Sequence, residues 1–178
     1  MVIEMENIIL KISFINHLKS LWGFIYMTIG LFVVDYYISI KRNLPHFWLF
    51  SSPAIIIFII FYGWLVFPAV ILHINYYLKN RNKEYEISED RMIVRDKQGN
   101  EKVYMKSDIS KIIKCTNGGN IFVSYGDYDF IRLDMKNGEH IYLTSLLYPK
   151  STIELKKIYF PDIPSYTVGR WICVTYGY

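Results

Sequence analysis

Two long apolar stretches dominate the first half of the chain. Residues 21–40 contain one charged side chain, Asp35, and residues 47–78 contain none. A transmembrane helix needs about 20 consecutive apolar residues, because backbone amides inside a bilayer must bond within their own segment. Both stretches are long enough, so the pattern predicts two membrane-spanning helices.

The second stretch is too long for a single crossing. Its 32 residues would form about 48 Å of helix at 1.5 Å rise per residue, whereas the hydrocarbon core is about 30 Å thick. Because proline is tolerated in a first helical turn, Pro53 predicts a span over residues 54–77, with a kink at Pro68. The short polar turn at residues 41–46 then makes residues 21–78 an antiparallel hairpin.

Lys and Arg residues near the spans predict the orientation, because they are more frequent in cytoplasmic segments. Five lie on the side of the termini and two lie in the turn, which favours a cytoplasmic membrane location with both termini in the cytoplasm. No small-residue cleavage site follows the first apolar run, so a removable signal peptide is not expected. The five are Lys11, Lys19, Lys79, Arg81 and Lys83, and the two are Lys41 and Arg42.

From residue 84 the apolar period changes to two, and turn residues recur every eight to ten positions. This pattern predicts a small antiparallel β domain. The Asn137-Gly138 turn is the strongest hairpin signal, and its flanks place Arg132 and Asp134 outward, toward solvent. The seven predicted strands cover residues 84–88, 91–96, 101–106, 109–115, 121–125, 129–135 and 139–144, followed by a helix over residues 151–159.

The fold class is therefore an α+β membrane protein in four parts. Residues 1–20 form a tail, 21–78 the hairpin, 79–160 a cytoplasmic β domain and 161–178 an extension whose alternation predicts an added strand. Within the tail, residues 8–14 fit either a short strand or an interfacial helix.

The segment YEISEDRMIVRDKQGNEKVYMKSDISKI, residues 85–112, resembles the bacterial pleckstrin-homology-like (PH-like) domain of small membrane proteins with two preceding transmembrane helices. The similarity rests on a strand pair, a Gly turn, a third strand and the phrase Ser-Asp-Ile-Ser-Lys-Ile. It implies two nearly orthogonal sheets with a helix closing one end. The first hairpin loop, residues 88–91, is short and acidic, so the resemblance does not imply inositol-lipid binding.

Three sets of residues are candidate sites. Asp35 is an ionisable residue inside a predicted span, which favours an interfacial or structural role over ion transfer so near the helix end. It cannot pair with His73, which lies toward the opposite leaflet. A second set, Lys79, Arg81 and Lys83, is a candidate membrane-surface contact. The third, Gly23, Met27 and Gly30, is a candidate helix-packing face, within one hairpin or between two chains.

No enzyme motif is present: the chain has no P-loop, Gly-rich nucleotide loop, nucleophile elbow or zinc-binding His pair. Cys115 and Cys173 are too few and too isolated to predict a disulfide framework or a metal site, which suits a reducing compartment. Basic residues are spread evenly, which argues against nucleic-acid binding. We expect no cofactor and no small-molecule substrate.

The leading functional hypothesis is a non-enzymatic, membrane-anchored PH-like module that binds a protein partner or forms a homo-oligomer. Strand addition at an exposed edge, or docking on a sheet face, is the expected mechanism. One alternative is a subunit of an oligomeric transporter or pore, with Asp35 lining the path. Another is a small membrane immunity or toxin component, which fits the size of the chain.

Overall fold

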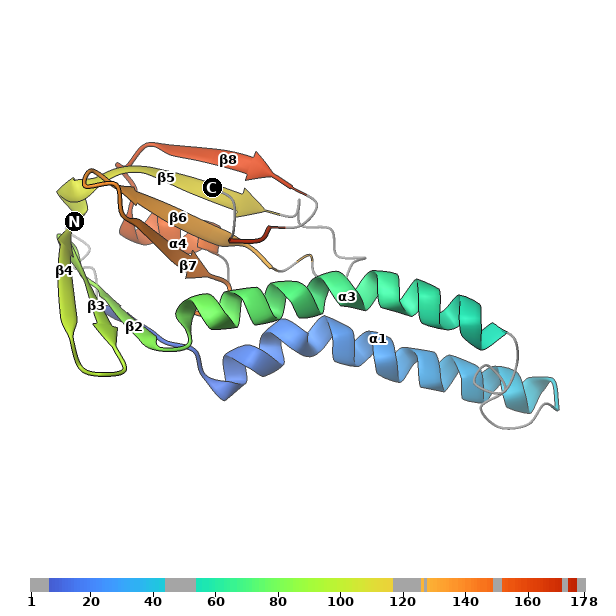
Figure 1. Ribbon diagram of the computed structural model, residues 1–178. Coiled ribbons are helices and arrows are strands. Elements are labelled where there is room, and N and C mark those ends of the chain that lie inside the picture. The colour runs from blue at the N-terminus through green and yellow to red at the C-terminus, as the bar shows by residue number, and fades with distance from the viewer. Residues whose placement is uncertain are drawn as a thin grey trace, which may run out of the picture.

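The computed structural model describes residues 7–43, 54–116, 126, 128–148, 152–170 and 173–175. Two long helices extend from a β domain made of two sheets (Figure 1). The elements are β1 (Ile8–Leu10), α1 (Phe14–Lys41), α3 (Ala54–Asn80), β2 (Lys83–Ile87), β3 (Arg91–Asp96), β4 (Glu101–Met105), the 3-10 turn η1 (Lys106–Asp108), β5 (Ile109–Thr116), β6 (Phe130–Met135), β7 (His140–Thr144), α4 (Thr152–Tyr159) and β8 (Ser165–Gly169).

Strand β1 is part of the β domain although it precedes both helices. It pairs antiparallel with β2, and the register sets Ile8 opposite Ile87 and Leu10 opposite Tyr85. Leu10 is buried in the core of the domain. Residues 8–10, which the sequence left open between strand and interfacial helix, therefore form the first strand, and the helical hairpin is an insertion between β1 and β2.

The two sheets have the orders β1-β2-β3-β4 and β7-β6-β5-β8. Six of the seven predicted strands are present within one residue at each end, while the predicted strand at 121–125 lies outside the described residues. The described strands between residues 83 and 144 pair antiparallel, as predicted, and the added strand β8 pairs parallel with β5. This added strand comes from the C-terminal extension, whose path returns along β5 instead of folding back as a hairpin.

Gly and Asn residues close the hairpins as expected. Gly99 and Gly138 have φ angles of +84° and +85°, a region that glycine adopts without steric cost. In the turn between β6 and β7 the side-chain oxygen of Asn137 accepts a hydrogen bond from the amide of Glu139, at 2.9 Å. The Asn137-Gly138 turn therefore sets the register of the hairpin, as predicted from the sequence.

The main core lies between the two sheets and is closed by α4. Alternate residues of β2, β5, β6 and β7 point into it, and Leu155 and Tyr159 of α4 complete it. The predicted helix start at Ser151 lies outside the described residues, and the helix described ends at Tyr159 as expected. The arrangement of two sheets with one closing helix agrees with the resemblance drawn from residues 85–112.

Arg132 and Asp134 point away from this core, as the alternation predicts, but the prediction that they face solvent is wrong. They are 7% and 5% exposed. Arg132 Nε lies 2.7 Å from Asp134 Oδ1, and Arg132 donates from a second nitrogen to Oδ2 at 3.1 Å. Lys111 and His140 flank the same carboxylate. Burial is tolerated here because the two charges are paired.

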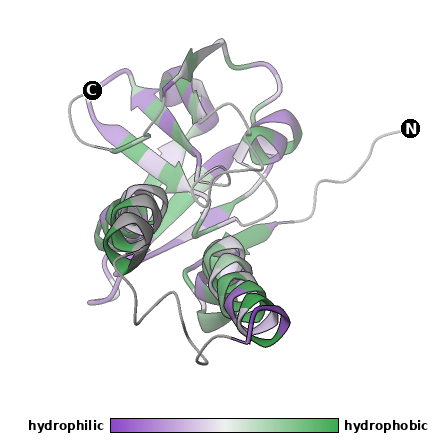
Figure 2. Cartoon of the chain, turned by 90° about the vertical axis from the view of Figure 1, so that its right-hand side faces the viewer, coloured by the Kyte–Doolittle hydropathy of each residue, from purple (hydrophilic) through white to green (hydrophobic). Residues whose placement is uncertain are grey.

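Helix α1 has an extended apolar surface that is exposed in the described part of the structure. Its N-terminus is capped by Ser13, whose side chain accepts from the amide of Asn16 at 3.2 Å. Of its 28 residues, Asp35 and Ser39 alone are buried. Among the described residues, α1 is the one helix long and apolar enough to cross a membrane by length and composition. Figure 2 looks along the helices and shows green, hydrophobic positions on both.

Helix α3 is shared between the hairpin and the β domain. Its last three turns pack on the outer face of the sheet that contains β6 and β7, where Ala69, Leu72 and Tyr76 join a second apolar cluster. The span predicted over residues 54–77 thus overlaps a segment that contacts protein. Apolar side chains are compatible with a bilayer and with a protein interface, so hydropathy could not locate the residue at which the contact with the β domain begins. Pro68 lies inside the helix, directly before the contact begins.

Candidate binding groove between the two sheets

The two sheets meet along an open seam between their edge strands β4 and β7. Strand β4 is the last in its sheet, and β7 is the first in the other. A hollow of about 340 Å³ opens between β4 and the β6-β7 turn. A neighbouring hollow of about 400 Å³ continues along β7. Both are lined by Lys102, Tyr104 and Glu139, so they form one groove.

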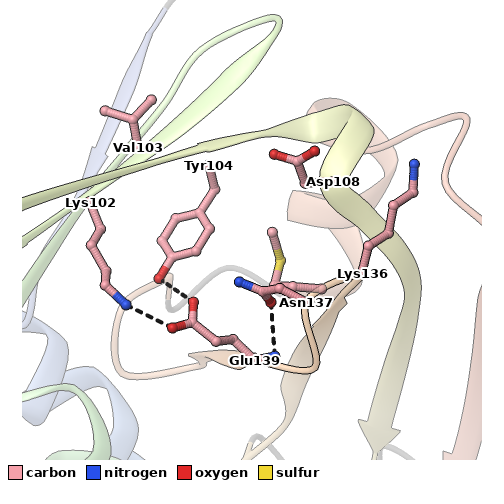
Figure 3. Close-up of a pocket in the computed structure, with 8 residues that line it drawn as sticks. Lys102, Val103, Tyr104, Asp108, Lys136, Asn137 and Glu139 are labelled. Atoms are coloured by element: carbon pink, nitrogen blue, oxygen red, sulfur yellow. Dashed lines mark hydrogen bonds and ion pairs between the residues drawn. The ribbon is translucent and has the colours of Figure 1, made fainter.

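Glu139 bridges the seam. Lys102 Nζ lies 2.7 Å from one of its carboxylate oxygens, and the Tyr104 hydroxyl donates to the other at 2.8 Å (Figure 3). The hydrogen bond from Lys102, and after it the one from Tyr104, holds the pKa of Glu139 below its usual range. The carboxylate in turn raises the pKa of Lys102. The groove is therefore closed at one point by a charged bridge whose members are all accessible to solvent or partly so.

The groove can bind a polar, extended ligand better than a small apolar one. Charged side chains line it on both walls, whereas pockets for small molecules are mainly apolar. On the outer face of β4, Val103 and Met105 are 55% and 42% exposed. An edge strand with exposed apolar side chains is suited to pairing with a strand from another chain. Among the described residues no cluster of His, Cys, Asp and Glu could hold a metal ion.

The three basic residues after the hairpin have different surroundings. Lys79 lies over the ring of Tyr142, 4.3 Å from its centroid, and burial lowers the pKa of Lys79. Arg81 and Lys83 instead line a hollow of about 320 Å³ together with Lys11. Lys79 thus packs against the β domain, and the other two lie at the elbow where the helices enter the sheet.

Asp35 lies in the hairpin half away from the β domain and is fully buried, with Ser39 beside it on the helix. His73 lies at the opposite end, as expected, where its Nε2 is 2.8 Å from Nδ1 of His17. Its Nδ1 is 2.9 Å from the hydroxyl of Tyr128, which is itself buried. This polar chain connects α1, α3 and the β domain. The sequence carried no signal for it, because the three residues are far apart along the chain.

In the candidate packing face, Gly23 and Gly30 have open space beside them in the described part of the chain, whereas Met27 between them is partly buried. A Cβ atom added at Gly23 or Gly30 would meet nothing within 4 Å, and the same holds at Gly63 on α3. The two helices contact one another elsewhere, for example through Thr28 and Tyr62, whose oxygens are 2.6 Å apart.

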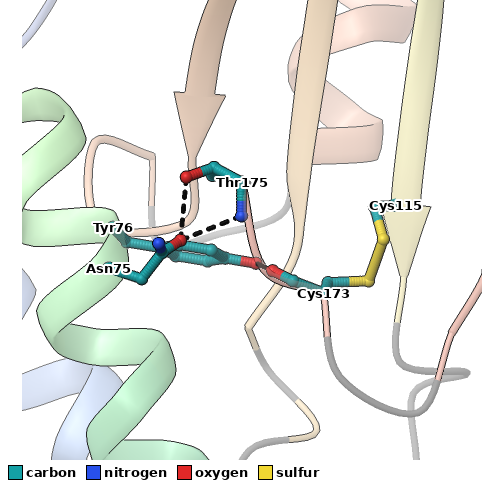
Figure 4. The surroundings of a disulfide bond; sticks show 5 residues. All are labelled: Asn75, Tyr76, Cys115, Cys173 and Thr175. Carbon is teal, nitrogen blue, oxygen red and sulfur yellow. Dashed lines mark hydrogen bonds between the residues drawn. A yellow bond between two sulfur atoms is a disulfide. The ribbon is translucent and has the colours of Figure 1, made fainter. Parts of the chain in front are cut away.

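The C-terminal tail is fastened at two places (Figure 4). Cys173 forms a disulfide with Cys115 of β5, and its carbonyl accepts from the hydroxyl of Tyr76 at 2.7 Å. Thr175 donates from its amide and its hydroxyl to the side-chain oxygen of Asn75, at 2.9 and 2.8 Å. The interpretation of the cysteines as isolated is wrong, because the parallel strand β8 carries the tail back to the end of β5.

A family model for the PH domain matches residues 10–156, which is more than half of the chain. The matched range includes both helices as well as strands β2 to β7 and most of α4. No curated protein and no solved structure matches the chain.

Proposed function

The chain belongs to the PH domain family, and we propose that it is a membrane-anchored, non-enzymatic interaction module of that family. PH domains are in general interaction modules and not catalysts. The position of the helices carries the proposal: they are inserted between β1 and β2, two strands that are paired in one sheet. The anchor is thus built into the domain and not joined to it by a linker.

The pairing of β1 with β2 supports an even number of membrane crossings. Both strands belong to one sheet, so both ends of the segment between them lie on one side of any membrane. If α1 crosses, the chain must return before β2, and α3 is the helix that leads back. This argument is independent of hydropathy, and it supports the second span.

The exposed surface of the helices supports a bilayer as their environment. Ile29, Phe32 and Val33 of α1 and Ile59, Ile60 and Trp64 of α3 are all more than 40% exposed. A continuous apolar surface of this kind on a water-soluble protein would aggregate. The part of α3 that precedes its contact with the β domain, residues 54–68, is about 22 Å long at 1.5 Å rise per residue. We propose that the crossing ends near Pro68, where one side of α3 begins to contact the β domain. This segment is shorter than the hydrocarbon core of about 30 Å, a mismatch that a bilayer meets by local thinning.

The β4-β7 groove is the proposed contact site for a protein partner or for a second copy of the chain. A partner strand would add to the open edge of β4, with Val103 and Met105 as its apolar contacts and the Lys102–Glu139 bridge as a polar one. The expected affinity comes from backbone hydrogen bonds, and the side chains of the groove select the sequence that fits.

Site-specific crosslinking in the native membrane tests this proposal. A photoreactive residue replaces Val103 on β4 in the full chain, and the same residue replaces Tyr166 on β8 as the control, because both side chains are exposed. We expect a defined crosslinked product from position 103 and none from position 166. A third variant carries the photoreactive residue in place of Gly30 on α1. If crosslinks formed only from this position, and only between two copies of the chain, the result would contradict the proposal and favour an oligomeric pore.

A further inference from the structure

The disulfide between Cys115 and Cys173 is evidence for the side of the membrane on which the β domain lies. The two Cα atoms are 5.8 Å apart, and both residues are fully buried. Hydrogen bonds from Tyr76 to the carbonyl of Cys173, and from Thr175 to Asn75, hold the tail at the same place. The sulfur atoms are thus brought together by the fold and shielded from solvent.

The disulfide has a clear structural task, because strand β8 is weakly held by side chains. None of the five residues of β8 is buried, and Tyr166 is 61% exposed. Its backbone pairs with β5, but it adds no side chain to the core. The bond from Cys173 to Cys115 fastens the chain just beyond β8 to the end of β5, and so keeps the strand in place.

Disulfides persist in oxidising compartments, whereas the thiol pools of the cytosol keep most cysteines reduced. We infer that the β domain lies on the oxidising side of the membrane, with the tip of the hairpin on the cytoplasmic side. The inference rests on the proposed membrane anchor. Bond formation removes two electrons and two protons from the thiols of Cys115 and Cys173. A disulfide-bearing oxidoreductase of that compartment accepts them by thiol-disulfide exchange.

This orientation is opposite to the one predicted by counting basic residues, and the structure explains the difference. Residues 69–80 of α3 pack on the β domain, so Lys79 lies about 15 Å of helix beyond the point where the crossing ends. Arg81, Lys83 and Lys11 lie at the same far elbow. Directly beside the spans, Lys19 alone remains on the domain side, against Lys41 and Arg42 at the tip.

The first measurement is the thiol state of the full chain in its native membrane. After acid quenching and denaturation, a maleimide that adds mass is applied with and without prior reduction. We expect no mass shift without reductant and two shifts after it. The C115S variant is the control, because it frees Cys173 and should give one shift without reductant. Two free thiols in the unreduced native chain would overturn the inference.

The second measurement locates the domain. Tyr166→Cys on β8 and Lys41→Cys at the tip are introduced one at a time, and an impermeant maleimide is applied to sealed cells. We expect labelling of the cysteine at position 166 from outside, and of that at position 41 only after permeabilisation. The reverse pattern would overturn the inference but leave the anchor intact. Labelling of both sites from outside would overturn the membrane-spanning proposal itself.

Discussion

The side chain of Asn80 joins the end of helix α3 to both sheets, and its removal should destabilise the β domain. Asn80 is 1% exposed. Its amide nitrogen donates to the hydroxyl of Tyr85 on β2 and to the carbonyl of Tyr142 on β7, both at 2.9 Å. Its amide oxygen accepts from the hydroxyl of Thr144 at 3.1 Å. Each partner is buried, so none can bond to water instead.

The expected cost follows from these three hydrogen bonds. A hydrogen bond contributes about 1 kcal/mol net, and a buried group left without a partner costs about 1–3 kcal/mol. Asn80→Ala removes three such bonds at once, so the free energy of unfolding should fall by about 3–5 kcal/mol. The matched control is Asn82, two residues further along in the exposed turn. Asn82→Ala should change the free energy of unfolding by less than about 0.5 kcal/mol.

Denaturant unfolding of the full chain in detergent micelles measures this difference, with near-ultraviolet circular dichroism of the tyrosines as the signal. Hydrogen exchange of β2 and β7 gives a second readout, because Asn80 contacts both strands. If Asn80→Ala unfolded at the same denaturant concentration as Asn82→Ala, α3 would not be a structural part of the β domain. The argument that the crossing ends near Pro68 would then fail as well.

Three further changes have defined outcomes. Because Lys102 lowers the pKa of Glu139, the bridge stabilises the fold above the ordinary Glu pKa, and this stabilisation should be lost as the pH falls through the lowered pKa. NMR of the Glu139 carboxyl group follows the titration, and E139Q should remove this pH dependence of stability. Tyr76→Phe should cost about 1 kcal/mol and raise hydrogen exchange in residues 173–175. Gly138→Ala, at φ +85°, should cost about 1 kcal/mol in thermal unfolding, whereas Gly23→Ala should not destabilise the chain.

Local patterns predicted most of the β domain. The alternation of residues 91–96 and the Asn137-Gly138 turn each specify their element within a few residues, and both are present as predicted. Strand β1 could be predicted only as one of two alternatives, because three residues are too short for a periodic signal and the partner strand lies beyond the whole hairpin. The short strand could be recognised only after β2 was placed beside it.

The candidate site could be predicted less well than the fold. The seam between β4 and β7 depends on how two sheets face one another, and no residue pattern encodes that arrangement. Alternation placed Arg132 and Asp134 away from the core, but it contains no information on what covers the opposite face. Likewise, Cys115 and Cys173 become neighbours only through the parallel pairing of β8.

The insertion of the helices between β1 and β2 also orders the events of biosynthesis. Strand β1 leaves the ribosome first, but its partner β2 is synthesised only after both helices are complete. The first sheet therefore cannot close until both helices have been synthesised and, on the proposed anchoring, have returned from the bilayer. A chain whose hairpin fails to insert would display an unpaired β2 edge, an aggregation-prone surface that quality-control proteases and chaperones can recognise. On the proposed anchoring, completion of the sheet thus follows insertion of the hairpin.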